Sequence, residues 1–305
     1  MPDVVAETLH ELIVATRILA NEKILDAFGH VSVRHPHDPQ RYFIPRHRAP
    51  ELAEISDIVE LTLESEPVRP TELRLYSERV IHGEIYKARP DVNAVCHHHA
   101  HTVLPFAISG REIVPVFHLA AVVGHVPFWD QRDEFGDTNM LVIKPEEGAS
   151  LARALGPHWT VLMRRHGATV AGTSLRELTF RTVFCSDNCK LLSQAMAMGH
   201  VDSLSPGEAK LTSAHQLRPP STNRAWDYWV RQVEKAGLMP AGNGAASGAK
   251  TTAKTTAKTT AKSADRTISK TGVASAARTR AHSAKRPVAK SAGKSARRAG
   301  PAKRR

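Results

Sequence analysis

The chain has 305 residues and a formal net charge of +12, but that charge is concentrated at one end. Residues 241–305 contain 17 lysines or arginines and one acid, which gives +16. The +12 of the whole chain less this +16 leaves −4 for residues 1–240. The body is therefore mildly acidic, and the net charge does not mark it as a nucleic-acid-binding domain.

The first half of the body predicts a helix followed by short strands. Apolar residues recur at helical spacing over residues 4–25, which predicts an amphipathic helix. Alternating patterns then predict strands over residues 30–34, 42–44 and 57–63. Residues 77–87 are predicted to form a second helix, with Ser77 as its N-cap.

The second half adds strands and two longer helices. Strands are predicted over residues 92–96, 160–163 and 170–172. Ser174 and Glu177 form a capping-box pattern that opens a long helix, and a last helix covers residues 225–235. The strands do not alternate regularly with helices. We therefore expect an α/β domain over residues 1–238, with a mixed, largely antiparallel sheet flanked by helices.

Residues 239–305 differ in composition from the rest of the chain. Ala, Lys, Arg and Thr dominate, and the sequence Thr-Thr-Ala-Lys occurs three times in succession from Thr251. Such a segment buries little apolar surface, so it is predicted to be a disordered tail. Its charge suits non-specific contact with nucleic acid or another polyanion, and a solubilising role is the alternative.

A histidine cluster is the strongest chemical signal. His97, His98 and His99 follow the predicted strand of residues 92–96. Residues two apart on a strand point to the same side, so His97 and His99 can bind one ion while His98 points away. His101 continues that face as a reserve ligand. Each ring needs partners for two nitrogens, so packing alone explains these adjacent histidines poorly.

The remaining ligands would come from other segments. His166 stands just past a predicted strand, next to Gly167, which permits a tight turn. Glu78 and Glu84, on the predicted helix of residues 77–87, are the candidate carboxylates. By pattern alone, a turn histidine and a solvated helical acid are the ordinary interpretations of these residues.

Four segments in this order carry a family resemblance. They read Ala27-Phe-Gly-His-Val-Ser-Val-Arg34, Ser77-Glu78, Cys96-His-His-His99 and Arg165-His-Gly167. Together they resemble the class II aldolase/adducin family over about residues 5–230. The resemblance implies a three-layer class II aldolase-like fold and a cyclic homotetramer with active sites at subunit interfaces. It also implies a divalent metal on His97, His99 and His166, with Glu78 as catalytic acid/base.

The chain departs from the sugar-phosphate aldolases of that family in the substrate segments. His30 replaces an Asn, and Ser77 follows Tyr76 where a Ser-Ser pair would stand. The phosphate loop is replaced by a loop with Arg46 and Arg48, and arginines suit carboxylate recognition. We expect these four residues, His30, Arg46, Arg48 and Ser77, to bind a carboxylated small-molecule substrate. The alternative for the two arginines is that they are exposed loop charges.

A further departure concerns the general acid. The aldolases carry a Tyr where this chain has Phe117-His118, so His118 is a candidate for protonation beside Glu78. With these changes the chain resembles the decarboxylase-like branch of the family. That branch contains the hydroxy-carboxymuconic-semialdehyde decarboxylases and the dihydroxyphthalate decarboxylases. A metal-stabilised enolate serves decarboxylation and aldol cleavage equally. We therefore predict a metal-dependent lyase, with decarboxylation preferred. An aldolase or epimerase acting on a sugar-like substrate and a non-catalytic adducin-like interaction protein are the alternatives.

The sequence also gives expectations about the identity of the metal and the cellular compartment. Three histidines with one carboxylate suit Zn²⁺ best, with Mn²⁺, Fe²⁺ and Co²⁺ as alternatives. Cys96, Cys185 and Cys189 suit no disulfide framework and fit a reducing, cytoplasmic compartment, in which they are buried as small hydrophobic residues. No signal-peptide pattern and no stretch of about 18 apolar residues is present, so no membrane contact is expected.

Overall fold

A seven-stranded sheet forms the centre of the computed structural model, which describes residues 3–241. In order across the sheet the strands are β3 (Ile58–Thr62), β2 (Arg41–Pro45), β1 (His30–Arg34), β4 (Ala94–His98), β7 (Gly167–Gly172), β6 (Thr160–Met163) and β5 (Phe128–Trp129). The β5–β6 pair is parallel, and all other neighbouring strands are antiparallel. The expectation of a mixed, largely antiparallel sheet is confirmed.

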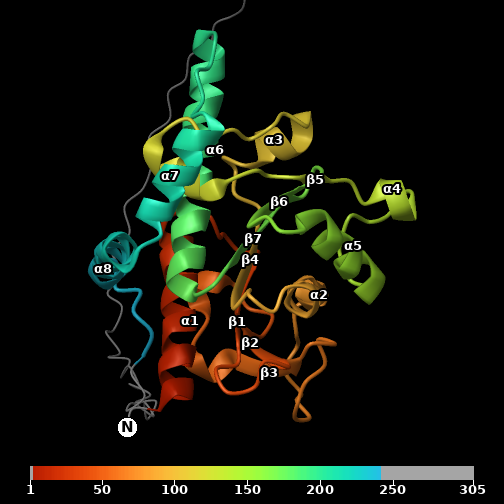
Figure 1. The fold of residues 1–305 in the computed structure, drawn as a ribbon. Coiled ribbons are helices and arrows are strands. Elements are labelled where there is room, and N and C mark those ends of the chain that lie inside the picture. Colours follow the sequence, from red (N-terminus) through yellow and green to blue (C-terminus); the bar gives the residue numbers. More distant parts are fainter. Residues whose placement is uncertain (1–2, 242–305) are drawn as a thin grey trace, which may run out of the picture. The chain divides into compact units, whose positions relative to one another are not determined.

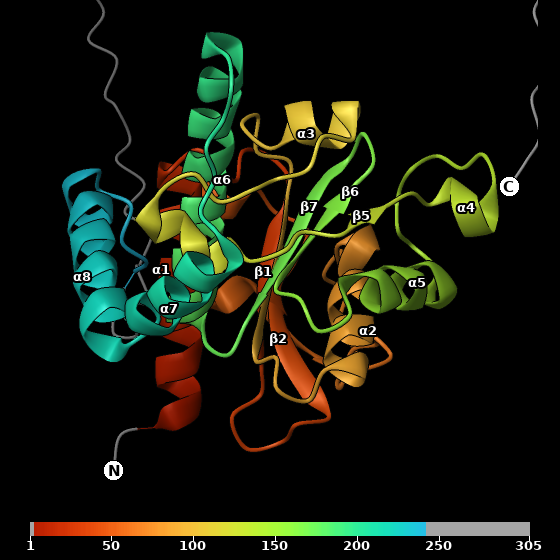
Figure 2. The ribbon, with the colours of Figure 1, turned by 45° about the horizontal axis from the view of Figure 1, so that its top comes forward.

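Helices cover both faces of this sheet and give a three-layer arrangement (Figure 1, Figure 2). One layer contains α1 (Val4–Asn21), α6 (Leu175–Met198) and α8 (Pro219–Lys235), and the other contains α2 (Val80–Ala88) and α5 (Pro145–Leu155). The remaining α-helices are α3 (Leu104–Ser109), α4 (Arg132–Phe135) and α7 (Pro206–Gln216). Short 3-10 turns are η1 (Pro50–Leu52), η2 (Ile55–Asp57), η3 (Ser77–Arg79) and η4 (His118–Val123).

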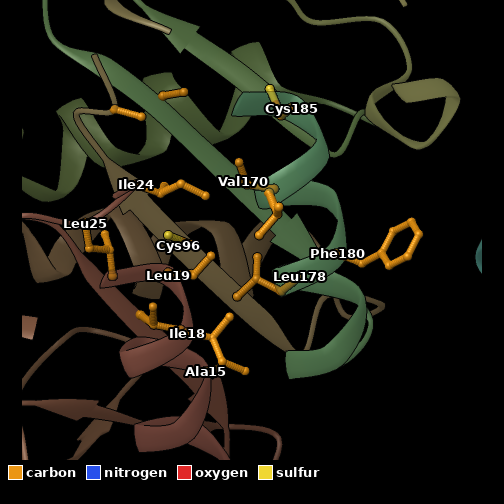
Figure 3. Packing of buried hydrophobic residues seen from close by; sticks show 14 of the residues in the cluster. Ala15, Ile18, Leu19, Ile24, Leu25, Cys96, Val170, Leu178, Phe180 and Cys185 are labelled. Atoms are coloured by element: carbon orange, nitrogen blue, oxygen red, sulfur yellow. The ribbon is translucent and has the colours of Figure 1, made fainter. Parts of the chain in front are cut away.

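The larger core lies between the sheet and the layer of α1 and α6 (Figure 3). Ile18 and Leu19 of α1 face Cys96 of β4, and Cys185 of α6 belongs to the same buried cluster. All three cysteines are buried free thiols, as expected from their spacing. This packing holds β4 in the middle of the sheet, where a one-residue shift in register would turn every side chain to the opposite face.

Some predicted helix starts are wrong in detail. The segment after Tyr76 begins as the 3-10 turn η3, and Ser77 lies inside the turn and makes no capping hydrogen bond. Ser174 does cap α6 by accepting from the Glu177 N–H at 3.2 Å. The Glu177 carboxylate, however, accepts from the Arg181 side chain instead of completing the predicted box.

Other elements were displaced or missed. The predicted strand of residues 92–96 lies two residues further on, so that β4 includes His97 and His98. The sequence patterns predict neither the helices α3, α4, α5 and α7 nor the short strand β5. Among residues 3–241, no helix combines the length and hydrophobicity needed to cross a bilayer. The predicted disordered tail falls outside the described residues from position 242 onward.

Candidate metal centre

The centre of the sheet brings three histidines to one point. His97, inside β4, pairs with His30 of β1 on one side and with Thr169 of β7 on the other. His99 follows the end of β4, and His166 lies in the turn between β6 and β7. The end of β4 and the start of β7 are hydrogen-bonded neighbours. These residues therefore meet at the same end of the two strands, although they lie far apart in sequence.

The three Nε2 atoms form a nearly equilateral triangle. The distances are 3.0 Å from His97 to His99, 3.3 Å from His97 to His166 and 3.1 Å from His166 to His99. Two nitrogens at tetrahedral positions around a zinc ion, with Zn–N bonds of about 2.0–2.1 Å, lie about 3.3–3.4 Å apart. The triangle therefore matches the spacing that one small divalent ion requires.

His97 has a hydrogen-bond partner for its second ring nitrogen on the neighbouring strand β7. Thr169 Oγ1 donates to the Met163 sulfur at 3.4 Å and lies 3.2 Å from His97 Nδ1. The threonine oxygen can accept from His97 Nδ1–H, which is the tautomer that a metal ion bound at Nε2 requires. His97 Nε2 then carries a lone pair directed into the triangle, which is how a partner of the second nitrogen prepares a metal-binding histidine.

Glu78 completes the cluster from the opposite side. Its Oε2 lies 3.8 Å from His97 Nε2, and its Oε1 lies 3.6 Å from His166 Nε2. The Val142 backbone N–H donates to Oε1 at 2.9 Å and fixes the carboxyl group. One ligand atom from each of the four residues lies within 4.8 Å of every other. Glu84, the other candidate carboxylate, instead pairs with Lys87 at 2.8 Å.

Burial keeps the histidines of the cluster neutral. It lowers the pKa of His97 well below the ordinary value, lowers that of His99, and lowers that of His166 to about 4. Burial acts in the opposite sense on Glu78 and raises its pKa to about 7, although the Val142 N–H opposes the shift. Neutral imidazoles with free lone pairs are the form that binds a metal. The donor set therefore fits a divalent cation.

A cavity of about 340 Å³ opens beside this cluster. Glu78 and His99 line it, as does Phe28, which is 65% exposed. The other lining residues are Ala27, Gly29, His30, His47, Arg48, Ala49, Tyr76, Ser77 and Leu141. Two of the four residues of the cluster, Glu78 and His99, thus stand where a small molecule can reach them.

A family comparison agrees with this geometry. The model of the class II aldolase and adducin N-terminal domain matches residues 10–193, more than half of the chain. The chain belongs to the class II aldolase and adducin family. The resemblance seen in the four sequence motifs is thereby confirmed.

Curated relatives of this class II aldolase/adducin chain include decarboxylases. The protein named Decarboxylase tropJ, from Talaromyces stipitatus, is 33% identical over 244 residues, which covers 72% of this chain and 92% of that protein. A 3,4-dihydroxyphthalate decarboxylase from Arthrobacter keyseri is 28% identical over 198 residues, covering 61% of this chain and 77% of the relative. Lyases of this family are thus related to the chain along most of its body.

The fold also matches a solved structure. An L-fuculose 1-phosphate aldolase from Glaciozyma antarctica superposes with a TM-score of 0.65 at 21% identity, covering 78% of this chain and 93% of the aldolase. At this identity the likeness concerns the fold alone. The expected class II aldolase-like fold is confirmed.

The remaining predicted site residues do not all reach the cavity. His30, Arg48 and Ser77 line it. Arg46 is not among the lining residues, and its Nε binds Asp57 Oδ1 at 2.6 Å. His118 is exposed at the start of η4 and, within one chain, lies outside the cavity.

Two other histidine predictions have clear structural outcomes. His98 is fully buried and turned away from the triangle, and its Nδ1 accepts from the Ala100 N–H at 3.3 Å. His101 is exposed and does not join the cluster. Sequence reasoning missed Thr169, whose place opposite His97 depends on strand pairing, and Val142, which contributes only a backbone N–H.

Gly167 is required by the close approach of two strands next to His166. An alanine there would place its Cβ 2.2 Å from the His98 carbonyl oxygen and 3.1 Å from the His99 ring. Gly167→Ala is therefore expected to lower the free energy of unfolding by roughly 1–3 kcal/mol, as overpacked sites do, and to weaken metal binding. Urea denaturation of the metal-free protein and metal titration measure the two effects.

Gly207→Ala provides the matched control. Its Cβ would meet only Ser205 Oγ at 4.0 Å, and α7 accepts alanine readily. If Gly167→Ala unfolded at the same urea concentration as wild type and bound metal equally well, the close approach would not constrain the turn.

Proposed function

We propose that this chain is a metal-dependent decarboxylase of a hydroxy or keto acid derived from an aromatic compound. Hydroxy-carboxymuconic semialdehyde and dihydroxyphthalates represent the substrate class. The observation that carries the proposal is the juxtaposition of three convergent, neutral histidines with one buried carboxyl group, two members of which, His99 and Glu78, line an open cavity. The decarboxylase relatives support the choice of reaction within the lyases of this family.

The walls of the cavity suit a planar acid. Phe28 offers an exposed ring, and Tyr76 and Leu141 add further apolar surface. His30 and Arg48 contribute polar N–H groups on the same cavity. An aromatic ring carrying a carboxylate combines the two kinds of surface, because its face is apolar and its edge is charged.

Within the proposed reaction the residues have separate tasks. His97, His99 and His166 would hold a divalent ion, whose Lewis acidity stabilises the negative charge left on the substrate when a C–C bond breaks. Loss of CO₂ leaves an electron pair on carbon, and a proton must be added there. Glu78 is suited to pass it on, because its carboxylate, ionised beside a bound cation, can accept a proton from a substrate hydroxyl and return it to that carbon, and the Val142 N–H fixes its position. The product then differs from the substrate by replacement of the carboxylate with hydrogen.

The two arginines of the 46–48 loop are expected to differ in function. Asp57 is buried and binds Arg46 Nε at 2.6 Å and Arg48 Nη1 at 2.8 Å. Arg48 also lines the cavity, whereas Arg46 does not. Arg48→Ala is therefore expected to raise KM for a dicarboxylic acid roughly tenfold or more, the effect of losing one charge-assisted hydrogen bond.

Arg46→Ala is the matched control, since it removes an arginine from the same loop and the same ion pair. It is expected to change KM less than twofold, and steady-state kinetics of both variants give the comparison. Equal KM values for Arg48→Ala and wild type would overturn the carboxylate-binding role of Arg48.

The alternatives have direct tests. An aldolase or epimerase would use the same metal ligands, and a non-catalytic adducin-like protein would need none of them. Incubation of the metal-reconstituted full chain with dihydroxyphthalate isomers and hydroxy-carboxymuconic semialdehyde, with assays for both CO₂ and aldehyde, separates the reactions. CO₂ release that His97→Ala abolishes is the expected result. No CO₂ from protein that binds one ion per chain would reject the decarboxylase proposal.

Four narrower expectations accompany the proposed function. Zinc is the expected metal, with Mn²⁺, Fe²⁺ and Co²⁺ as alternatives, and elemental analysis of purified protein identifies it. The homotetramer stays a prediction from the family, which light scattering tests. A cytoplasmic location and contact of the tail with polyanions also stay predictions.

A further inference from the structure

Four buried polar side chains form a hydrogen-bonded row that leads from the core to the cavity. Tyr86 OH lies 2.7 Å from Ser32 Oγ, and Ser32 Oγ lies 2.6 Å from His82 Nδ1. His82 Nε2 in turn lies 2.6 Å from His30 Nδ1. Tyr86, Ser32 and His82 are at most 1% exposed, and His30 is 4% exposed. The row is sealed at the tyrosine and opens only at His30, which lines the cavity.

The free edge of His30 faces the cavity. Its Nδ1 is bound to His82, while its Nε2 has no hydrogen-bond partner among residues 3–241. The buried side-chain atoms without a partner in that range are His98 Nε2 and Thr160 Oγ1, so His30 Nε2 is open to the cavity that its ring lines. The ring lies against Tyr76, at 4.6 Å between centroids, and against His97, at 5.3 Å. A ligand near His97 would therefore meet His30 Nε2.

The direction in which hydrogen bonds are donated along the row decides which tautomer His30 adopts. Within residues 3–241, no carboxylate lies at ion-pair distance from His30 or His82, so each ring is a neutral imidazole with one N–H. If Tyr86 donates to Ser32, then Ser32 donates to His82 Nδ1, and His82 Nε2–H donates to His30 Nδ1. His30 then carries its only proton on Nε2.

The opposite direction leaves a buried donor unused. It would require Tyr86 O–H to donate elsewhere, yet Ser32 Oγ is the only side-chain acceptor at hydrogen-bond distance from that hydroxyl among the described residues. An unmade hydrogen bond at a buried donor disfavours that arrangement roughly 5- to 150-fold. The buried hydroxyl of Tyr86 thus fixes the proton positions along the whole row.

We infer that His30 is a specificity-determining donor, which offers Nε2–H to a carboxylate or carbonyl oxygen of the substrate, and that His82 is the positioning residue that holds it. The substrate class rests on the proposed function, whereas the tautomer rests on the hydrogen bonds alone. His82 fixes both the orientation of the His30 ring and its tautomer, as buried partners do for metal-bound histidines.

Variants at His30 test the donor. His30→Phe keeps a ring without an N–H and is expected to raise KM roughly 10- to 100-fold, with a smaller change in kcat, because a binding interaction is removed. His30→Gln retains an N–H group on a side chain of similar reach and is expected to restore most of the loss. Equal KM values for both variants would overturn the donor role.

A double-mutant cycle tests the positioning by His82. His82→Phe is expected to raise KM about tenfold in the wild-type background and to have no further effect on KM in His30→Phe. A merely structural role for His82 would give the same increase in both backgrounds and would overturn the positioning role. Circular dichroism and bound-metal stoichiometry identify variants that have lost the fold.

A spectroscopic measurement decides the tautomer without turnover. Solid-state ¹⁵N spectra of histidine-labelled protein are expected to show His30 and His82 protonated at Nε2, with signals assigned by their loss in His30→Gln and His82→Phe. Tyr86→Phe should add the second tautomer to the His30 signal. Tyr42→Phe, which removes another buried hydroxyl outside the row, should leave the signal unchanged. Protonation of His30 at Nδ1 in wild-type protein would overturn the inference.

These measurements separate two kinds of failure. If wild-type protein releases neither CO₂ nor aldehyde from the acids tested, the proposed function fails and the ¹⁵N spectra alone decide the tautomer. If wild-type protein is active but the cycle is additive, the proposed function stands and the role of His82 is rejected.

Discussion

Replacing His97 with alanine is expected to remove the bound ion and abolish CO₂ release. His97 is fully buried, and its Nε2 lies within 3.3 Å of both other ligand nitrogens, so its loss opens one corner of the triangle. The loss of metal affinity should exceed the roughly 10- to 100-fold decrease that follows removal of a residue supporting a ligand. Isothermal titration with zinc and elemental analysis of the dialysed protein measure it.

His101→Ala is the control for this experiment. His101 belongs to the same histidine-rich segment, but it is exposed and lies outside the cluster. Its removal is expected to leave metal stoichiometry and CO₂ release at wild-type values. Retention of one tightly bound ion in His97→Ala, or its loss in His101→Ala, would contradict the proposed ligand set.

The strand pattern in the sequence was sufficient to predict part of this centre. Alternation along residues 92–99 places His97 and His99 on one side and His98 on the other, and the fold keeps that alternation. The pattern did not identify the hydrogen-bond partner of His97 Nδ1, which leaves Nε2 of that ring to bind a metal. Thr169 lies opposite His97 because of β4–β7 pairing, which depends on the register of strands separated by more than 60 residues.

A side-chain partner within the same loop region explains why the roles of Arg46 and Arg48 were harder to predict. Two arginines in a short loop look like a carboxylate-binding pair, yet both bind Asp57, whose role was not foreseen. Burial opposes ionisation of Asp57, but the Glu54 N–H and the two guanidinium groups prevail and lower the pKa of its carboxyl. A charged residue in a loop therefore could not be assigned to a ligand until its partner within the protein was known.

Replacing Glu78 with glutamine is expected to lower kcat roughly 10²- to 10⁴-fold, the usual contribution of a positioned acid or base, while zinc stays bound. Glutamine keeps the shape of the side chain and an oxygen that accepts from the Val142 N–H. Glu84→Gln is the control on α2, because Glu84 pairs with Lys87 and does not line the cavity. Activity equal to wild type in Glu78→Gln with a full complement of metal would reject the acid/base role.

The same substitution is expected to change how the stability of the metal-free protein depends on pH. Burial raises the pKa of Glu78 from 4.5 to about 7, so between these values the folded state binds more protons than the unfolded state. The stabilisation linked to this proton is fully present below pH 4.5 and is lost as pH rises through about 7. The free energy of unfolding of the wild type, less that of Glu78→Gln, should therefore fall over that pH window, as urea denaturation measures.

Metal binding should oppose the effect of burial on Glu78 and lower the pKa of its carboxyl group. A divalent cation among the three histidines favours the ionised carboxylate, so zinc binding at pH 6 is expected to expel the proton of Glu78. The histidines contribute little to that release, because burial lowers the pKa of His166 to about 4 and holds that of His97 well below its ordinary value. Calorimetry in two buffers of different ionisation enthalpy should detect close to one proton per ion in wild type and close to none in Glu78→Gln. Equal proton release from the two proteins would mean that Glu78 is already ionised before the metal arrives.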